Sequence, residues 1–126
     1  MAVSTGAPHL QRGRAAEDRA AAHLTAQGLQ ILTRNYRVGG GEIDLVARHG
    51  AELVFVEVRS RRSAAFGTAA ESVTPAKRRR ILLAAQHYLQ SLDQRTPPPC
   101  RFDIVSITGA VDGGHLDWLR NAFTND

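Results

Sequence analysis

The chain has 126 residues, of which 43% are hydrophobic and 22% are charged, so one domain can bury a sizeable core. Its single cysteine, Cys100, excludes an intrachain disulfide and any metal site built from several cysteines. No apolar run approaches the roughly 18 residues that cross a bilayer, and residues 1–12 contain none that could act as a signal peptide. We therefore expect a cytoplasmic protein that makes no membrane contact.

The net charge of +4 suits a negatively charged partner such as nucleic acid. Aromatic residues make up only 6% of the chain, which disfavours a surface built from base-stacking platforms. Because a modest positive charge also keeps ordinary proteins soluble, charge alone is a weak indication of nucleic-acid binding.

The hydrophobic pattern predicts a single domain over residues 13–126, preceded by a loose tail over residues 1–12. Gly28 is a natural stop for a first, alanine-rich helix, and Thr74 followed by Pro75 is typical of the start of a second. The expected ranges are 14–27 for the first helix, 29–38, 42–48 and 52–59 for three strands, 60–72 for a polar connection, 101–108 for a strand and 115–119 for a short last strand. The order α-β-β-β-α-β-(β) implies an α/β fold with a mixed sheet flanked by helices.

Acidic residues alternate with apolar ones in the second and third predicted strands. The period of two places Glu42 and Asp44 on one face of their strand, with Ile43 and Leu45 on the other. In the next strand Glu57 shares a face with Phe55 and Arg59, opposite a face of valines.

The turn between these two strands predicts which residues face each other. A two-residue loop of Gly50 and Ala51, with glycine first, fits a type II′ hairpin turn. Counting back from this turn sets Asp44 opposite Glu57, and Glu42 opposite Arg59. Directly opposed carboxylates repel each other, so the Asp44–Glu57 pair requires a compensating cation.

Two kinds of cation could neutralise the predicted pair. A divalent metal is one, because Mg²⁺ is held by one or two carboxylates together with phosphate oxygens; Arg59 and neighbouring arginines are the other. Glu17 supplies a third acid, since it lies on the inward stripe of the first helix with Ala21. Its alternative role is to favour the helix dipole from near the N-terminus.

Basic residues gather after the third strand and at the start of the second helix. Cations in the first turn of a helix oppose its dipole, and a bound phosphate would relieve that repulsion. The alternative is a solvated charge run without a ligand. The candidate phosphate-binding residues are Arg59, Arg61, Arg62, Lys77, Arg78, Arg79 and Arg80.

Several short motifs resemble the YraN-like family of bacterial proteins, and the likeness covers residues 13–123. The motifs are Gly41–Leu45, Val54–Arg59, Phe66–Gly67, Arg101–Asp103 and Asn121–Phe123. That family is similar to the PD-(D/E)xK nuclease superfamily, which includes restriction endonucleases and archaeal Holliday junction resolvases. The resemblance therefore implies a restriction endonuclease-like fold.

The same resemblance implies a catalytic site that binds Mg²⁺ or Mn²⁺. Asp44 and Glu57 match the two metal-binding acids, and Glu17 resembles the acid contributed by the first helix. Arg59 stands where the superfamily has a lysine, and arginine is not a general base because it stays protonated. Lys77, the only lysine in the chain, is a candidate for the missing amine.

These residues lead to two expectations about function. The first is a metal-dependent endonuclease that hydrolyses phosphodiester bonds, acting on DNA rather than RNA, with branched DNA as a resemblance-based candidate. The second is a nucleic-acid-binding or adaptor module that keeps the fold without the chemistry, as Arg59 would favour. A homodimer would suit symmetrical cutting of both strands.

Overall fold

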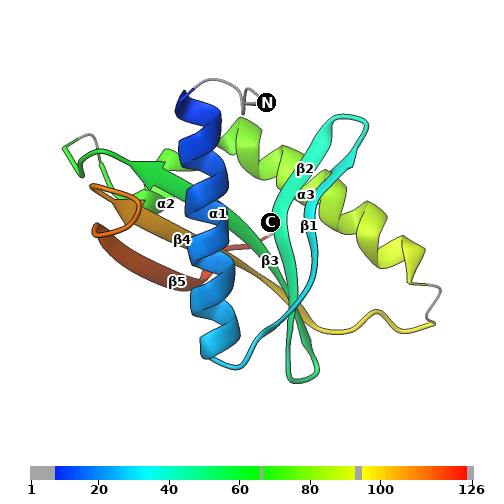
Figure 1. Cartoon of the computed structure of the whole chain (residues 1–126). Helices are drawn as coiled ribbons and strands as arrows, with labels where there is room; N and C mark the ends of the chain where they lie inside the picture. The colour runs from blue at the N-terminus through cyan, green and yellow to red at the C-terminus, as the bar shows by residue number, and fades with distance from the viewer. Residues whose placement is uncertain (1–7, 66, 93–94, 125–126) are drawn as a thin grey trace, which may run out of the picture.

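A computed structural model of the chain describes residues 8–65, 67–92 and 95–124. Figure 1 shows a mixed sheet between helices, in agreement with the expected α/β order. The elements are α1 (Pro8–Ala26), β1 (Gln30–Val38), β2 (Gly41–His49), β3 (Glu52–Arg61), α2 (Ala69–Ser72), α3 (Pro75–Ser91), β4 (Cys100–Thr108) and β5 (His115–Phe123). No helix in these ranges is both long enough and apolar enough to span a membrane.

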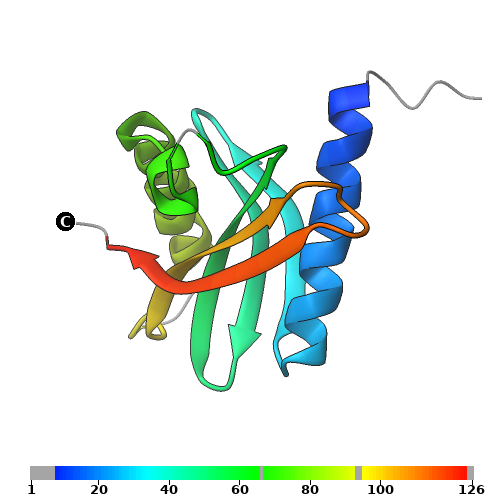
Figure 2. The same cartoon turned by 90° about the vertical axis from the view of Figure 1, so that its left-hand side faces the viewer.

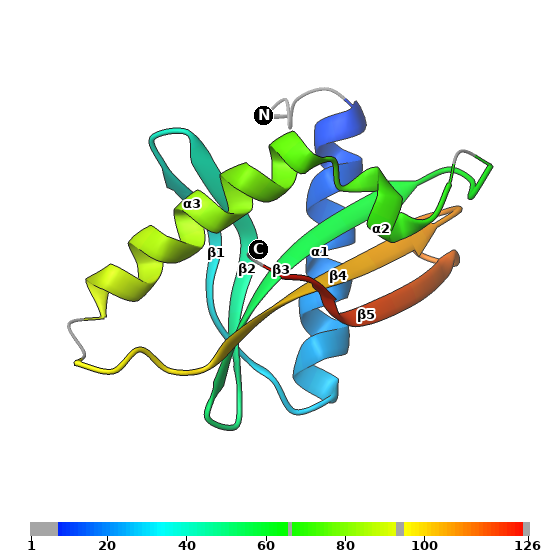
Figure 3. The same ribbon diagram turned by 180° about the vertical axis from the view of Figure 1, so that it is seen from behind.

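The five strands of the described chain lie in the order β1-β2-β3-β4-β5. Only β3 and β4 pair in parallel, because α2 and α3 carry the chain back across the sheet between them. Figure 2 shows α1 on one face and α2 with α3 on the other, and Figure 3 shows α3 running obliquely over β1 and β2.

Each face of the sheet has its own apolar cluster, as strands covered on both sides require. Leu24 of α1 and Val56 of β3 belong to the cluster beneath α1. Ile81 of α3 and Phe55 of β3 belong to the cluster beneath α3. The valines of β3 therefore pack under α1, on the face opposite Glu57, as the alternation predicted.

The hairpin between β2 and β3 confirms the predicted register. His49 pairs with Glu52 across a turn in which Gly50 has a φ of 63°, and the ladder continues to Leu45 opposite Val56. Beyond that pair β2 remains with β1 and β3 remains with β4. The two strands therefore separate at the position where the register brings Asp44 to Glu57.

Three element predictions were wrong in extent. Residues 8–12 are helical and not a tail, since α1 begins at Pro8 and proline is tolerated in the first turn of a helix; residues 1–7 lie outside the described residues. The 60–72 connection contains α2, whose N-cap Thr68 forms a capping box with Glu71. The last strand extends to Phe123 and is as long as β4.

Candidate active site

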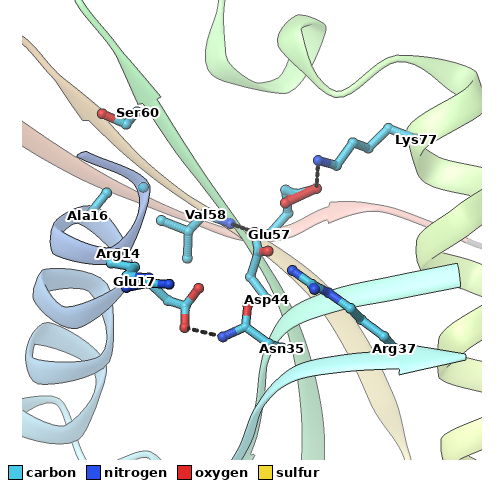
Figure 4. Close-up of a pocket in the computed structure, with 11 residues that line it drawn as sticks. Arg14, Ala16, Glu17, Asn35, Arg37, Asp44, Glu57, Val58, Ser60 and Lys77 are labelled. Atoms are coloured by element: carbon cyan, nitrogen blue, oxygen red, sulfur yellow. Dashed lines mark hydrogen bonds and ion pairs between the residues drawn. The ribbon is translucent and has the colours of Figure 1, made fainter. Parts of the chain in front are cut away.

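A pocket of about 710 Å³ opens where β2 and β3 separate, between α1 and the first turn of α3 (Figure 4). Its lining residues come from α1, β1, β2, β3 and α3, so the pocket depends on elements that are far apart in the chain. They are Gly13, Arg14, Ala16, Glu17, Asn35, Arg37, Asp44, Glu57, Val58, Ser60 and Lys77.

Asp44 and Glu57 form the centre of this pocket. The Asp44 Oδ2 atom accepts a hydrogen bond of 2.8 Å from the backbone N–H of Val58, one of the first residues past the last ladder pair. The Glu57 side chain contacts Asp44, and the residue as a whole is only 4% exposed. Burial, followed by the hydrogen bond to Asp44 and its charge, raises the pKa of Glu57 to about 9. Glu57 therefore holds its proton more tightly than an exposed carboxyl group does.

Lys77 is the cation that lies nearest to this pair. Its Nζ atom is 3.3 Å from Glu57 Oε2 and 3.8 Å from Glu42 Oε1. Lys77 lowers the pKa of Glu57, but by less than burial and Asp44 raise it. Among the described residues Glu57 Oε2 is buried without a hydrogen-bond partner, so the contact with Lys77 is an ion pair without hydrogen-bond geometry.

Glu17 faces the pocket from α1, as its helical stripe predicted. Its Oε1 atom accepts a hydrogen bond of 2.9 Å from Asn35 Nδ2 and lies 4.0 Å from Arg34 Nη1. Burial and the charge of Asp44 raise the pKa of Glu17, while the bond from Asn35 and the charge of Arg34 oppose them. The structure thus brings the three predicted acids to one pocket.

The predicted pairing of Glu42 with Arg59 is wrong, because β2 has left β3 before reaching Glu42. Glu42 instead lies 3.7 Å from Arg37 Nε and 3.3 Å from Arg80 Nη2. Arg59 pairs in the sheet with Ser106 of the neighbouring strand β4. Its Nε atom donates a hydrogen bond to Ser72 Oγ at 3.3 Å. Arg59 therefore lies outside the lining of the acidic pocket.

The strict alternation predicted for β2 also fails at Asp44. Ile43 packs in the cluster beneath α3 and Leu45 in the cluster beneath α1, although a regular strand would place both on one face. The irregularity lies opposite Asn35, whose φ is 52°.

The predicted basic residues divide between internal contacts and exposed positions. Arg61 donates to Gly67 O at 2.6 Å, and Arg78 donates to Val73 O and Ala70 O while its guanidinium covers the Phe123 ring. The exposed members of the predicted set are Arg62, Arg79 and Arg80.

Four polar residues of the pocket escaped the sequence prediction: Arg14, Asn35, Arg37 and Ser60. Asparagine is depleted in strands, so Asn35 within a strand-like run was the one available signal. Nothing in the pattern distinguished Arg14 or Arg37 from the other exposed arginines.

The carboxylates suit a hard divalent cation in chemistry but form a small donor set. Oxygen donors such as Asp44 and Glu57 are those that Mg²⁺ and Mn²⁺ prefer, and the buried Glu57 Oε2 atom lacks a hydrogen bond within the described chain. In the described ranges, no group of three or more His, Cys, Asp or Glu is arranged to hold a metal ion. Any metal here would thus rest on two carboxylates with water or substrate oxygens.

The comparisons with known proteins agree with one another. The profile described as "Uncharacterised protein family UPF0102" matches residues 16–107. A UPF0102 protein of Cupriavidus necator is 60% identical over 91% of this chain and 84% of its own length. A UPF0102 protein of Dechloromonas aromatica is 51% identical over 100% of this chain and 99% of its own. This chain therefore belongs to the UPF0102 family, the YraN-like family that its motifs resemble.

Proposed function

We propose that this protein binds nucleic acid and hydrolyses its phosphodiester bonds with the help of Mg²⁺ or Mn²⁺. One observation carries the proposal: the facing carboxyl groups of Asp44 and Glu57 lie in a pocket with a lysine ammonium 3.3 Å from Glu57. A carboxyl group as buried as Glu57, placed beside a second acid, is costly for stability and is often found at functional sites. Oxygen donors beside cations also suit a metal and a phosphate together.

The acids would have separate roles. Asp44 and Glu57 would hold the cation, which requires Glu57 to release the proton that its raised pKa retains. Bound there, the metal would supply a more acidic water and neutralise charge on the phosphate. Glu17 would accept hydrogen bonds from water on the α1 side of the pocket.

The cations at the pocket would hold the substrate backbone. Lys77, Arg14 and Arg37 line the pocket, and Arg79 and Arg80 are exposed on the first turns of α3. Contacts of this kind address phosphates and sugars and carry little sequence information. We infer a substrate chosen by its shape and charge, with DNA as the first candidate.

The alternative is a nucleic-acid-binding module without chemistry. It is favoured by the position of Arg59 outside the acidic pocket and by the absence of a three-ligand group in the described residues. In that case Lys77 would serve as the permanent counter-ion of the acidic pair.

The deciding experiment incubates the protein with labelled duplex DNA, single-stranded DNA, a four-way junction and RNA, each with Mg²⁺, Mn²⁺ or EDTA. Glu57→Gln keeps the shape of the side chain and removes a donor oxygen, and Glu52→Gln makes the same change at the far end of the β2–β3 hairpin. We expect metal-dependent cleavage by the wild type and by Glu52→Gln, and a loss of about 100-fold or more in Glu57→Gln. Salt-sensitive binding without cleavage would support the binding module, and neither binding nor cleavage would reject both.

A further inference from the structure

Asn35 combines an unfavourable backbone conformation with a contact to an acid of the pocket. Its φ of 52° lies in the left-handed region, although both neighbours are paired in the sheet: Arg34 with Leu45 and Tyr36 with Ile43. L-residues avoid this region, and asparagine only tolerates it better than most. The distortion is therefore local to one residue inside β1.

Stability alone does not account for this conformation. The side-chain amide donates to Glu17 Oε1 at 2.9 Å, but Asn35 is exposed, and one hydrogen bond from an exposed donor contributes little net free energy. Backbone strain that stability does not explain is often found at functional sites.

The consequence of the bond is the orientation of Glu17. The competing partner is Arg34, whose Nη1 lies 4.0 Å from Glu17 Oε1 and 2.6 Å from Asp18 Oδ1, on the solvent side of α1. Without the amide, attraction to Arg34 and repulsion from Asp44 would both turn the Glu17 carboxylate outward. Figure 4 shows the Asn35 amide directed to Glu17 within the pocket.

The distortion also coincides with the break in β2. Asn35 and Asp44 both lie between the paired positions Arg34–Leu45 and Tyr36–Ile43. Asp44 is where the side-chain alternation of β2 fails. The unusual conformation of β1 and the direction of Asp44 are thus features of the same point in the sheet.

We propose that Asn35 is a positioning residue, whose left-handed backbone sets its amide where it holds Glu17 beside Asp44. This inference rests on the proposed metal-dependent function, because it assigns Glu17 its place in that site. Asn35 itself need not touch metal or substrate.

The chain offers a matched control for the test. Asn121 is the other non-glycine residue in the described ranges with positive φ, also 52°, and its backbone N–H binds Asp103 in β4. Asn35→Gly and Asn121→Gly relieve the same backbone strain, but only the first removes a side chain from the pocket.

The experiment measures the dissociation constant for Mn²⁺ by calorimetry, the cleavage rate and the melting temperature. We expect both glycine variants to melt at or above the wild-type temperature, and only Asn35→Gly to bind Mn²⁺ about tenfold more weakly and cleave more slowly. Glu17→Gln and the double variant Asn35→Gly/Glu17→Gln should lose the same amount of Mn²⁺ affinity and of cleavage rate, because Asn35 acts through Glu17. Wild-type Mn²⁺ affinity in Asn35→Gly, or fully additive losses in the double variant, would overturn the proposal.

A crystal structure of Asn35→Gly separates this inference from the proposed function. If the wild type neither binds Mn²⁺ nor cleaves nucleic acid, the proposed function fails, and the position of Glu17 still decides the role of Asn35. A Glu17 carboxylate turned to Arg34 supports the positioning role, and one that stays beside Asp44 contradicts it.

Discussion

Two acidic side chains are buried in the described part of the chain, and their surroundings differ. Asp103 is fully buried and accepts hydrogen bonds from Arg101 Nε, Trp118 Nε1 and the backbone N–H of Asn121. Glu57 is almost as buried but has an oxygen without a hydrogen bond in those ranges. Asp103, whose hydrogen bonds are satisfied, links β5 to β4, whereas the free oxygen of Glu57 is available for a ligand.

Glu57 should make stability depend on pH. Its pKa is raised to about 9 in the folded protein and lies near 4.5 when unfolded, so between these values the folded state holds the extra proton. The free energy of unfolding should therefore fall as the pH rises, by up to about 1 kcal/mol per pH unit. Glu57→Gln, which mimics the protonated form, should lose this dependence.

Urea unfolding at pH 5, 6, 7 and 8 tests this expectation. The free energy of unfolding of Glu57→Gln should exceed that of the wild type by more at higher pH. The two values should converge below the pKa of Glu57 in the unfolded chain. Asp112→Asn, in the exposed turn before β5, should follow the wild-type curve. Parallel curves for Glu57→Gln and the wild type would rule out the raised pKa.

At the scale of elements, the position of α3 sets the distance between Lys77 and the acids. Thr74 caps the helix by accepting a hydrogen bond from the Lys77 N–H, and Pro75 opens it, as predicted. Gly41 lets β2 approach the helix closely, because an added Cβ would lie 2.8 Å from Arg80 O and 2.9 Å from Ala84 N. The glycine before Glu42 therefore has a packing role in the site.

Gly41→Ala should destabilise the protein by about 1–3 kcal/mol, because backbone atoms of α3 must move away. Gly39→Ala, two residues earlier in the same turn, meets nothing within 4 Å and should change stability by no more than about 1 kcal/mol. Chemical denaturation of both variants measures the difference. Equal effects would show that α3 is not seated against Gly41.

At the scale of the whole molecule, the net charge of +4 is less informative than its distribution. The pocket has acids at its centre, and its lining includes the exposed residues Arg14 and Arg37. Phosphates bound at these arginines would bring a backbone over the acids, which repel it unless a cation lies between them.

Removing these arginines should therefore weaken nucleic-acid binding in a salt-dependent way. Arg14→Ala and Arg37→Ala should each reduce the slope of log K against log salt by about 1. The loss of affinity should be similar for nucleic acids of every sequence. Arg48→Ala, on the exposed strand end near Gly50, is the control. Fluorescence anisotropy across a salt series measures the slopes, and an equal effect of Arg48→Ala would contradict a localised binding site.

Short-range patterns were sufficient for much of the fold. The helix caps at Gly28 and Thr74, the Gly50 turn and the register from it depend on a few neighbouring residues. The closeness of Asp44 to Glu57 followed by counting from that turn. The capping box of α2 was equally local, with Thr68 and Glu71 three residues apart, and could have been read from the sequence.

The sequence by itself thus determined the order of elements, the hairpin register, the inward direction of Glu17 and the family. Only the tertiary structure decided that β2 leaves β3 after the pair of Leu45 with Val56. It also decided that Lys77 and not Arg59 lies at the acids, and that Asn35 holds Glu17. The physical reason is that these contacts join elements far apart in the chain. They cannot be predicted from the hydrophobic period or the residue propensities of any one segment.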